Sequence, residues 1–318
     1  MKIALLGAGY AAKTLYVKAA KSLSLQVTGV FDRLAQSGME VADELGCVFY
    51  SEYDKMLDQS GADTIIIATS TNTHLPFIEI AADKGIKHIF CEKPAGINLD
   101  EATKIAKICH DNDITLKVGY KMRYEPIFSK IKDLLLQNRI GDVQEITLNF
   151  YQTLPHSEWF FDHGVLSETL VHIIDLSNWF VGVEPLEIEC TKGYRLGYKA
   201  EDSASVFINY DGNIRANIAG GWIQDYPFIS GRKNILIHIV GTGGYISGIR
   251  PDRLLVCDEE GQSVIEIGQG DSIELELLEF IDICQGDVSK NYGAGIDDAI
   301  KVHKILEASN QSASVKRR

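Results

Sequence analysis

The sequence predicts an α/β domain built on a parallel sheet, followed by an α+β domain with a largely antiparallel sheet. Over the first 120 residues, short apolar runs alternate with helical segments, and a glycine turn follows the first run. Such alternation is typical of βαβ units. After about Val118, strand-like runs succeed one another with turns between them, as in antiparallel sheets. The 318 residues suit two domains, which we place at 1–120 and 121–318.

The first domain is predicted from five apolar runs with helices between them. The runs are almost continuously apolar, as strands buried on both faces of a parallel sheet are. They are Lys2–Leu6, Leu25–Phe31, Thr64–Ala68, His88–Cys91 and Thr115–Val118. The helical segments are Thr14–Ser22, Met39–Leu45, His74–Lys84 and Asp100–Asn112.

The second domain mixes helices and strands without regular alternation. We expect a helix from Pro126 to about Asn138, a strand at Val143–Gln152 and a helix at Val165–Phe180. Asp211-Gly212-Asn213 is a plausible hairpin turn. Five further runs are strand-like: Leu186–Tyr194, Ala204–Tyr210, Ile214–Trp222, Ile235–Gly241 and Arg253–Cys257. Two helices, Ile273–Gln285 and Asp297–Ser309, close the chain.

Composition excludes several classes of protein. Hydrophobic residues make up 45% and charged residues 24%, as in soluble globular proteins. The net charge of −13 disfavours nucleic acid as a partner. No apolar run approaches the roughly 20 residues of a membrane helix, and the N-terminus does not resemble a signal peptide. The six cysteines are scattered singly, which predicts a reducing cytoplasm and no zinc site.

A glycine-rich turn follows the first predicted strand. Gly7 and Gly9, with Tyr10 and Ala11 leading to Ala12, form the G-x-G-x-x-A version of the dinucleotide-binding fingerprint. In that motif the first glycine permits the tight turn, the second lets the backbone approach a pyrophosphate, and the alanine packs closely. The amides at the helix start favour the phosphate charge. The alternative is a chance glycine turn, which the position between strand and helix disfavours.

Asp32 and Arg33 end the second predicted strand, close to the expected distance of about 20 residues from the glycines. A carboxylate at this place hydrogen-bonds a ribose 2′-hydroxyl and repels a 2′-phosphate, so Asp32 favours NAD(H) over NADP(H). Arg33 complicates this preference, because an arginine at this turn could stack on the adenine or bind a 2′-phosphate. An ordinary surface turn is the alternative interpretation.

Several segments together resemble one known family. Glu92-Lys93-Pro94 follows a predicted strand, where a side chain points toward the ligand crevice of an open α/β sheet. Together with other segments along the chain, this motif resembles the Gfo/Idh/MocA oxidoreductases, and the resemblance spans nearly the whole chain. Those other segments are Ala68–His74, Ala81–Gly85, Val118–Pro126, Ile140–Val143, Val240–Gly244 and Asp298–Ser309.

The resemblance implies a Rossmann domain, an open-faced sheet domain, and an NAD(P)-dependent oxidoreductase that acts on a sugar, cyclitol or derivative bound between them. His172 would carry the hydroxyl proton, and Lys93 would stabilise charge on the same oxygen. Cofactor-proximal positions would include Thr69, Asn72, His74, Glu92, Lys93 and Arg123. Substrate-proximal positions would include Lys93, Tyr120, Glu168, His172 and Asp175. His74 could instead cap a helix, and Arg123 could instead pair with a carboxylate. The resemblance implies no metal.

The sequence departs from the family pattern before the candidate histidine. Glu168 stands where the family usually has aspartate, Leu170 replaces a glycine, and only Gly164 remains of a glycine run. In a regular helix Glu168, His172 and Asp175 would share one face, with Trp179 below them. The opposite, apolar face would be formed by Leu166, Leu170, Ile173 and Phe180.

Two other functions stay open. The altered positions are compatible with a ligand-responsive binding protein of the same fold, as some relatives are. Hydride transfer could also serve another substrate, such as a dihydrodiol or an imine.

Assembly is expected to involve the second domain. A sheet with helices on one side would leave an apolar face, and such faces usually mark interfaces. The runs Ile214–Trp222 and Ile235–Val240 are candidates, and the resemblance implies homodimers or homotetramers.

Overall fold

The computed structural model describes residues 1–155, 158–223, 234–250, 253–288, 291–312 and 314–316. The chain forms two compact units. The first comprises Met1–Tyr124 and Asp271–Ile300, and the second comprises Glu125–Gly270 and Lys301–Arg318. We describe each unit by itself.

The first unit is a Rossmann domain around a seven-stranded sheet, in the order β15-β6-β5-β4-β1-β2-β3. All its strands are parallel except β15, which pairs antiparallel with β6. The order 3-2-1-4-5-6 is that of doubly wound dinucleotide-binding domains, so the predicted fold class is confirmed. The strands are β1 Ile3–Leu6, β2 Val27–Phe31, β3 Val48–Tyr50, β4 Thr64–Ile67, β5 His88–Cys91, β6 Thr115–Val118 and β15 Ala294–Gly295.

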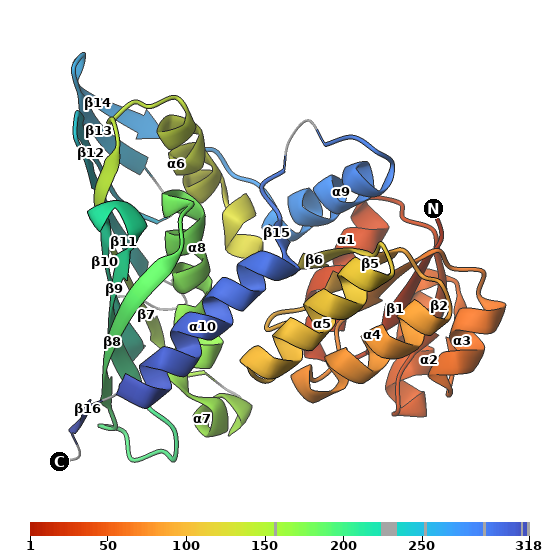
Figure 1. The fold of residues 1–318 in the computed structure, drawn as a ribbon. Helices are drawn as coiled ribbons and strands as arrows, with labels where there is room; N and C mark the ends of the chain where they lie inside the picture. Colours follow the sequence, from red (N-terminus) through yellow and green to blue (C-terminus); the bar gives the residue numbers. More distant parts are fainter. Residues whose placement is uncertain (156–157, 224–233, 251–252, 289–290, 313, 317–318) are drawn as a thin grey trace. The chain divides into compact units, whose positions relative to one another are not determined.

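Helices cover the sheet of the first unit (Figure 1). The helices α4 and α5 pack against each other, as do α1 and α2. Asn98 caps α5 by accepting a hydrogen bond from the amide of Glu101. The bounds are α1 Val17–Ser22, α2 Ala35–Leu45, α3 Tyr53–Gln59, α4 His74–Asp83, α5 Leu99–Asp111 and α9 Ser272–Cys284.

The helix α9 changes the division that we predicted, because it belongs to the first unit and not to a continuous domain over 121–318. Its apolar residues Ile273, Leu277 and Phe280 join the buried core formed by β1, β5 and α1. The ring of Phe280 lies edge-on to that of Phe90 in β5, with the two ring centroids 5.5 Å apart. The apolar face of α9 is therefore buried against the core of the Rossmann domain. This burial explains why the chain comes back to the first unit after Gly270.

The second unit is built on a nine-stranded sheet in the order β14-β13-β12-β11-β7-β10-β9-β8-β16. The pairs β7–β10 and β8–β16 are parallel and the other pairs are antiparallel, so the predicted mostly antiparallel sheet is confirmed. The strands are β7 Val143–Thr153, β8 Pro185–Gly193, β9 Ser203–Tyr210, β10 Arg215–Ile223, β11 Asn234–Gly241, β12 Gly244–Ile249, β13 Arg253–Asp258, β14 Gly261–Glu266 and β16 Ser314–Lys316.

Helices lie on one side of this sheet (Figure 1). The helix α8 packs against β7 and β10, and α6 packs against α8. The last helix, α10, begins in the first unit and ends in the second. The bounds are α6 Pro126–Leu136, α7 Glu158–Val165, α8 Val171–Val181 and α10 Ile296–Ser312.

The apolar side of the two candidate interface runs lies in the core of the second unit. Ile218 of β10 is fully buried, as are Ile235, Ile237 and Ile239 of β11. The opposite side of β11 carries Leu236, whose side chain is 42% exposed. The apolar pattern of these runs thus reflects packing against the unit's own helices, and it does not identify an interface. Among the described residues, no helix is long and apolar enough to cross a membrane.

Candidate active site

The glycine turn after β1 has the geometry that the motif predicts. Gly7 has φ +100°, and a Cβ there would lie 2.5 Å from the carbonyl oxygen of Ala68. The space where Gly9 would carry a Cβ is open to at least 4 Å. Ala12 is fully buried and Tyr10 is 85% exposed. The turn therefore leaves its backbone accessible at Gly9, which fits a dinucleotide pyrophosphate.

The helix after this turn opens differently from the prediction. Residues Ala12–Tyr16 form a π turn, and only Val17–Ser22 continues as an α-helix. A π turn inserts one residue into the helical spiral and is common at functional sites. Tyr16, its last residue, is buried, and its hydroxyl donates a 2.7 Å hydrogen bond to Oε1 of Glu92.

Asp32 interacts with the glycine turn directly. Its Oδ2 accepts a 2.6 Å hydrogen bond from the amide of Ala8, and its Oδ1 accepts one of 2.7 Å from the amide of Leu34. Each carboxylate oxygen has a further lone pair, so a ribose hydroxyl can still be bound. The side chain of the neighbouring Arg33 is exposed. Asp32 thus shapes the turn in addition to its predicted role.

His74 joins the two loops that follow β4 and β5. Its imidazole is fully buried, with Nε2 3.2 Å from the carbonyl oxygen of Thr69 and Nδ1 3.0 Å from that of Pro94. Burial lowers its pKa. The hydroxyls of Thr69 and Thr73 lie 2.8 Å apart in the first of these loops. His74 therefore has no surface to offer a cofactor, and its position is that of a loop-bridging residue. Asn72 is exposed in the same loop.

The Glu92-Lys93-Pro94 motif follows β5 at the end predicted. Lys93 is half-buried and precedes a cis proline. Its amide donates a 2.8 Å hydrogen bond to Oε2 of Glu92, whose other oxygen is bound by Tyr16. Both carboxylate oxygens of Glu92 therefore accept hydrogen bonds that stabilise the loop after β5.

Two further predicted residues of the first unit are buried. Arg123 is 2% exposed, donates to the carbonyl oxygen of Tyr292 at 3.2 Å, and lies 3.5 Å from Oδ1 of Asp298. This is the carboxylate pairing that the sequence left open as an alternative. Tyr120 is 1% exposed. Neither side chain presents a substantial surface to a ligand in this structure.

The candidate histidine of the second unit lies on a helix with an irregular start. Gly164, with φ +84°, interrupts α7 one residue before its end, and residues Leu166–Leu170 form a second π turn before α8. The regular spacing that we expected for Glu168, His172 and Asp175 is therefore wrong at its first step, because the π turn rotates Glu168 relative to α8.

Burial distinguishes these three residues. Glu168 and His172 are half-buried, whereas Asp175 is fully buried. The expected division into a polar and an apolar face is also wrong, because α8 is enclosed almost all round. Val171, Ile174 and Leu176, outside the predicted apolar face, are also fully buried. Among these three residues, Glu168 and His172 each keep a partly accessible side chain.

Side chains from β7, from β10 and from the loop before β9 hold the second π turn in place. The Thr169 hydroxyl accepts hydrogen bonds from Nε2 of Gln152 at 2.9 Å and from Nε1 of Trp222 at 3.1 Å. Glu201, itself buried, accepts a 3.1 Å hydrogen bond from the amide of Leu166. Sequence reasoning missed these residues because no motif connects partners so far apart along the chain.

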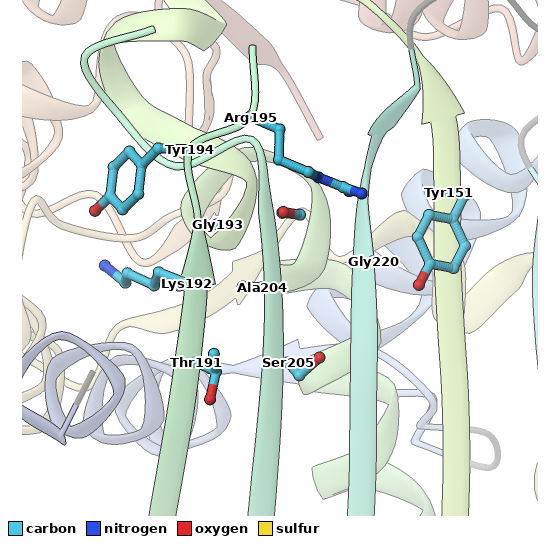
Figure 2. Close-up of a pocket in the computed structure, with 10 residues that line it drawn as sticks. Tyr151, Thr191, Lys192, Gly193, Tyr194, Arg195, Ala204, Ser205 and Gly220 are labelled. Atoms are coloured by element: carbon cyan, nitrogen blue, oxygen red, sulfur yellow. The ribbon is translucent and has the colours of Figure 1, made fainter. Parts of the chain in front are cut away.

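A separate cavity of about 680 Å³ lies over the strands of the second sheet (Figure 2). Figure 2 shows the side chain of Arg195 directed toward the strand of Gly220, with Tyr151 on the next strand and with Thr191 and Ser205 farther down β8 and β9. The lining contains none of the predicted catalytic or cofactor residues. This cavity is therefore distinct from the predicted site.

Family models match both units. A model described as the oxidoreductase family with an NAD-binding Rossmann fold matches residues 1–120, and the GFO/IDH/MocA C-terminal domain matches residues 128–247. The chain belongs to the Gfo/Idh/MocA oxidoreductase family. The resemblance inferred from the motifs is thus confirmed.

Curated members of the Gfo/Idh/MocA family are similar over much of the chain. The rhizopine catabolism protein MocA of Rhizobium meliloti is 27% identical, covering 98% of this chain and 95% of its own. The scyllo-inositol 2-dehydrogenase (NAD+) of Bacillus subtilis is 26% identical, covering 77% and 74%. A D-xylose 1-dehydrogenase [NADP+] of Haloarcula marismortui is 24% identical, covering 85% and 78%. Both cofactors therefore occur among these relatives.

Solved structures share the fold. An oxidoreductase from Agrobacterium radiobacter, solved in complex with NAD+, L-tartaric acid and magnesium, has a TM-score of 0.88 at 19% identity, covering 98% of this chain and 96% of its own. This likeness supports the two-unit architecture of a Gfo/Idh/MocA protein and nothing finer.

Proposed function

We propose that this protein is an NAD(P)-dependent dehydrogenase that oxidises, reversibly, a secondary hydroxyl of a cyclitol, a sugar or a sugar derivative. The proposal is carried by two side chains, each half-buried within its own unit, in a chain of this family: Lys93 after β5 and His172 on α8. Relatives named as inositol and xylose dehydrogenases support the substrate class.

The glycine turn and Asp32 are proposed to hold the cofactor. The amides near Gly9 would bind the pyrophosphate, and the Asp32 carboxylate would accept a hydrogen bond from the ribose. Thr69, Asn72 and the loop of Glu92 would complete the site. When bound, the nicotinamide supplies the acceptor or donor of the hydride. We propose a preference for NAD(H), since Asp32 opposes a 2′-phosphate.

His172 is proposed as the proton carrier. An imidazole accepts and returns a proton near neutral pH, which is what removal of a hydroxyl proton requires. Lys93 is proposed to stabilise the negative charge that develops on that oxygen, because an ammonium placed beside a forming alkoxide lowers the barrier. Glu168, which is half-buried in the π turn before α8, would orient the imidazole or bind a neighbouring hydroxyl.

The buried residues are proposed to act through others. His74 would hold the loops of Thr69 and Pro94, and Arg123 would anchor the chain near Asp298. Asp175 and Tyr120, fully buried, would support the substrate-facing side chains and not contact the substrate themselves.

The test is a turnover screen with NAD+ and NADP+ against inositols, sugars and nucleotide sugars, followed by His172→Ala with the best substrate. Loss of a general base typically lowers kcat by about 100- to 10,000-fold, and NAD+ affinity should not change. Near-wild-type turnover in His172→Ala would sink this mechanism. Absence of turnover with every polyol would favour the ligand-responsive binding protein instead.

A further inference from the structure

Tyr16 lies between two parts of the first unit that carry different chemistry. It is the last residue of the π turn that comes after the glycine turn, and its ring packs edge-on to Phe90, with centroids 5.6 Å apart. Its hydroxyl reaches Glu92, the first residue of the motif that contains Lys93. The single buried side chain of Tyr16 thus connects the helix that follows the glycine turn to the Glu92-Lys93-Pro94 segment, which we call the lysine loop.

The Glu92 carboxylate is held from two sides. Oε1 accepts the Tyr16 hydroxyl at 2.7 Å, and Oε2 accepts the Lys93 amide at 2.8 Å. Gly119 lies against this pair, since a Cβ there would be 3.2 Å from the Tyr16 oxygen and 3.4 Å from Oε2 of Glu92. Two donors and a close backbone leave the carboxylate little freedom, although Glu92 is only half-buried.

Tyr16 acts as the donor in this arrangement. Burial, and then the carboxylates of Glu92 and Glu276, raise the pKa of Tyr16 well above its ordinary value. The phenol therefore keeps its proton, and a carboxylate oxygen can only accept it. Hydrogen bonds to an ionised acceptor are the stronger kind, so this contact fixes the orientation of Glu92.

The π turn brings the hydroxyl into reach. One inserted residue rotates the later residues of the helix by about 100° relative to an uninterrupted α-helix. Tyr16 is the last residue of this π turn, and from there its side chain contacts both Phe90 and Glu92.

We propose that Tyr16 is a positioning residue for Lys93, and that it acts through Glu92. This inference rests on the proposed function, in which the Lys93 ammonium stabilises charge on the reacting oxygen. Tyr16 orients the Glu92 carboxylate, and this carboxylate accepts a hydrogen bond from the amide of Lys93. Tyr16 thereby fixes the position of the Lys93 backbone, from which the catalytic side chain extends. Small displacements of catalytic groups are costly, since about 1 Å can lower the rate by about 100-fold.

The test compares Tyr16→Phe with a matched control, Tyr53→Phe. The Tyr53 hydroxyl is also mostly buried in the first unit and donates one hydrogen bond, of 3.0 Å, to the carbonyl oxygen of Phe77. Each variant keeps its ring and loses one hydrogen bond, but only Tyr16 contacts Glu92. Three quantities are measured: kcat with the best polyol, the Kd of NAD+ by calorimetry, and hydrogen–deuterium exchange of the Lys93 amide by mass spectrometry.

We expect Tyr16→Phe to lower kcat by about tenfold, to leave the NAD+ Kd unchanged, and to accelerate exchange at Lys93. Tyr53→Phe should change none of these. Equal kcat in the two variants, or equal exchange at Lys93, overturns the inference while the proposed function stands. If the wild-type protein turns over no polyol, the proposed function fails. The exchange comparison then decides alone: faster exchange in Tyr16→Phe supports the Tyr16–Glu92–Lys93 linkage, and unchanged exchange overturns it.

Discussion

Asp32 influences the choice of cofactor in two ways at the level of the single residue. Its charge opposes a 2′-phosphate, and its two hydrogen bonds to the amides of Ala8 and Leu34 shape the glycine turn. Removing the side chain therefore removes a repulsion that only NADP+ experiences, and it weakens a turn that both cofactors use. Exposed Arg33 is left to attract the additional phosphate.

Asp32→Ala should narrow or reverse the preference for NAD+. We expect the ratio of the two dissociation constants to shift toward NADP+ by about tenfold, equivalent to about 1.4 kcal/mol. Calorimetric titration of both cofactors measures the ratio. The control, Asp43→Ala, removes an exposed charge on α2 and should leave the ratio unchanged. Tighter binding of NADP+ by the wild-type protein would show that Arg33 dominates.

The π turn at Leu166–Leu170 is the element on which the proposed proton carrier depends. It begins after Gly164, which adopts φ +84° and leaves no room for a side chain. A Cβ at Gly164 would lie 2.3 Å from the Glu201 carboxylate, which binds the amide of Leu166 and pairs with Lys192 at 3.5 Å. The start of the helix and a buried ion pair therefore occupy the same small volume.

Gly164→Ala should destabilise the protein by about 2 to 4 kcal/mol, since its φ +84° and ψ +164° are essentially restricted to glycine and this strain adds to displacement of a buried carboxylate. The control is Gly182→Ala, at the end of α8, where φ is +77° but no atom lies within 4 Å of the added Cβ. That change should cost only about 1 to 2 kcal/mol, the strain alone. Denaturant unfolding measures both. If the two variants lost the same free energy of unfolding, displacement of the Glu201 carboxylate would not be the cause of the larger loss expected at Gly164.

At the level of elements, apolar pattern explains what could be predicted. Strands such as His88–Cys91 and Thr115–Val118 were predicted at the observed bounds, because continuous apolar runs mark strands buried on both faces. The strand Gly261–Glu266 was missed, since most of its residues are exposed and carry no apolar run. Neither π turn was predicted, because one inserted residue leaves no signature in local composition.

In the candidate site, too, some residues could be predicted from the sequence and others could not. Gly7, Asp32 and Lys93 belong to short motifs whose spacing reflects their chemistry, so they could be predicted. The residues that hold the site in place contact partners far away in the sequence. Tyr16 bonds to Glu92, and Trp222 bonds to Thr169 in the second π turn. Which buried side chains meet is decided by packing, and no spacing rule expresses it.

His303 connects the stability of the whole molecule to pH. Burial within α10 lowers its pKa to about 4, whereas in the unfolded chain an imidazole titrates near 6.5. Well above pH 6.5 neither the folded nor the unfolded state is protonated at His303, and the full stability is present. As pH falls toward 4, only the unfolded chain gains the proton, so stability is lost across that window, by up to about 3 kcal/mol.

His303→Leu should remove this loss. We expect the variant to lose less unfolding free energy than the wild-type protein between pH 7.5 and pH 5, by about 2 kcal/mol. The control is His110→Gln, an exposed position on α5, which should keep the wild-type dependence on pH. Urea titrations at the two pH values measure the difference. Parallel curves for wild type and His303→Leu would show that His303 is not the cause.

We expect the whole molecule to assemble as a homodimer or homotetramer. The outer side of the second sheet exposes large side chains on β9, β11 and β7, namely Phe207 at 53%, Leu236 at 42% and Tyr151 at 39%. Light scattering at micromolar concentration should report the oligomer, and Phe207→Glu should weaken it. Leu34→Glu, at a 59% exposed position in the first unit, should not. A monomeric wild-type protein would defeat this prediction.

The return of α9 to the first unit has a consequence for the order of synthesis. A ribosome completes β1 to β6 long before it adds Ile273, Leu277 and Phe280, which fill the core against Phe90. Until then the nascent Rossmann sheet exposes apolar surface, and all of Glu125–Gly270 is made in the meantime. A fragment that stops near residue 120 would carry the same exposed surface permanently, and we expect it to aggregate more readily than the full chain.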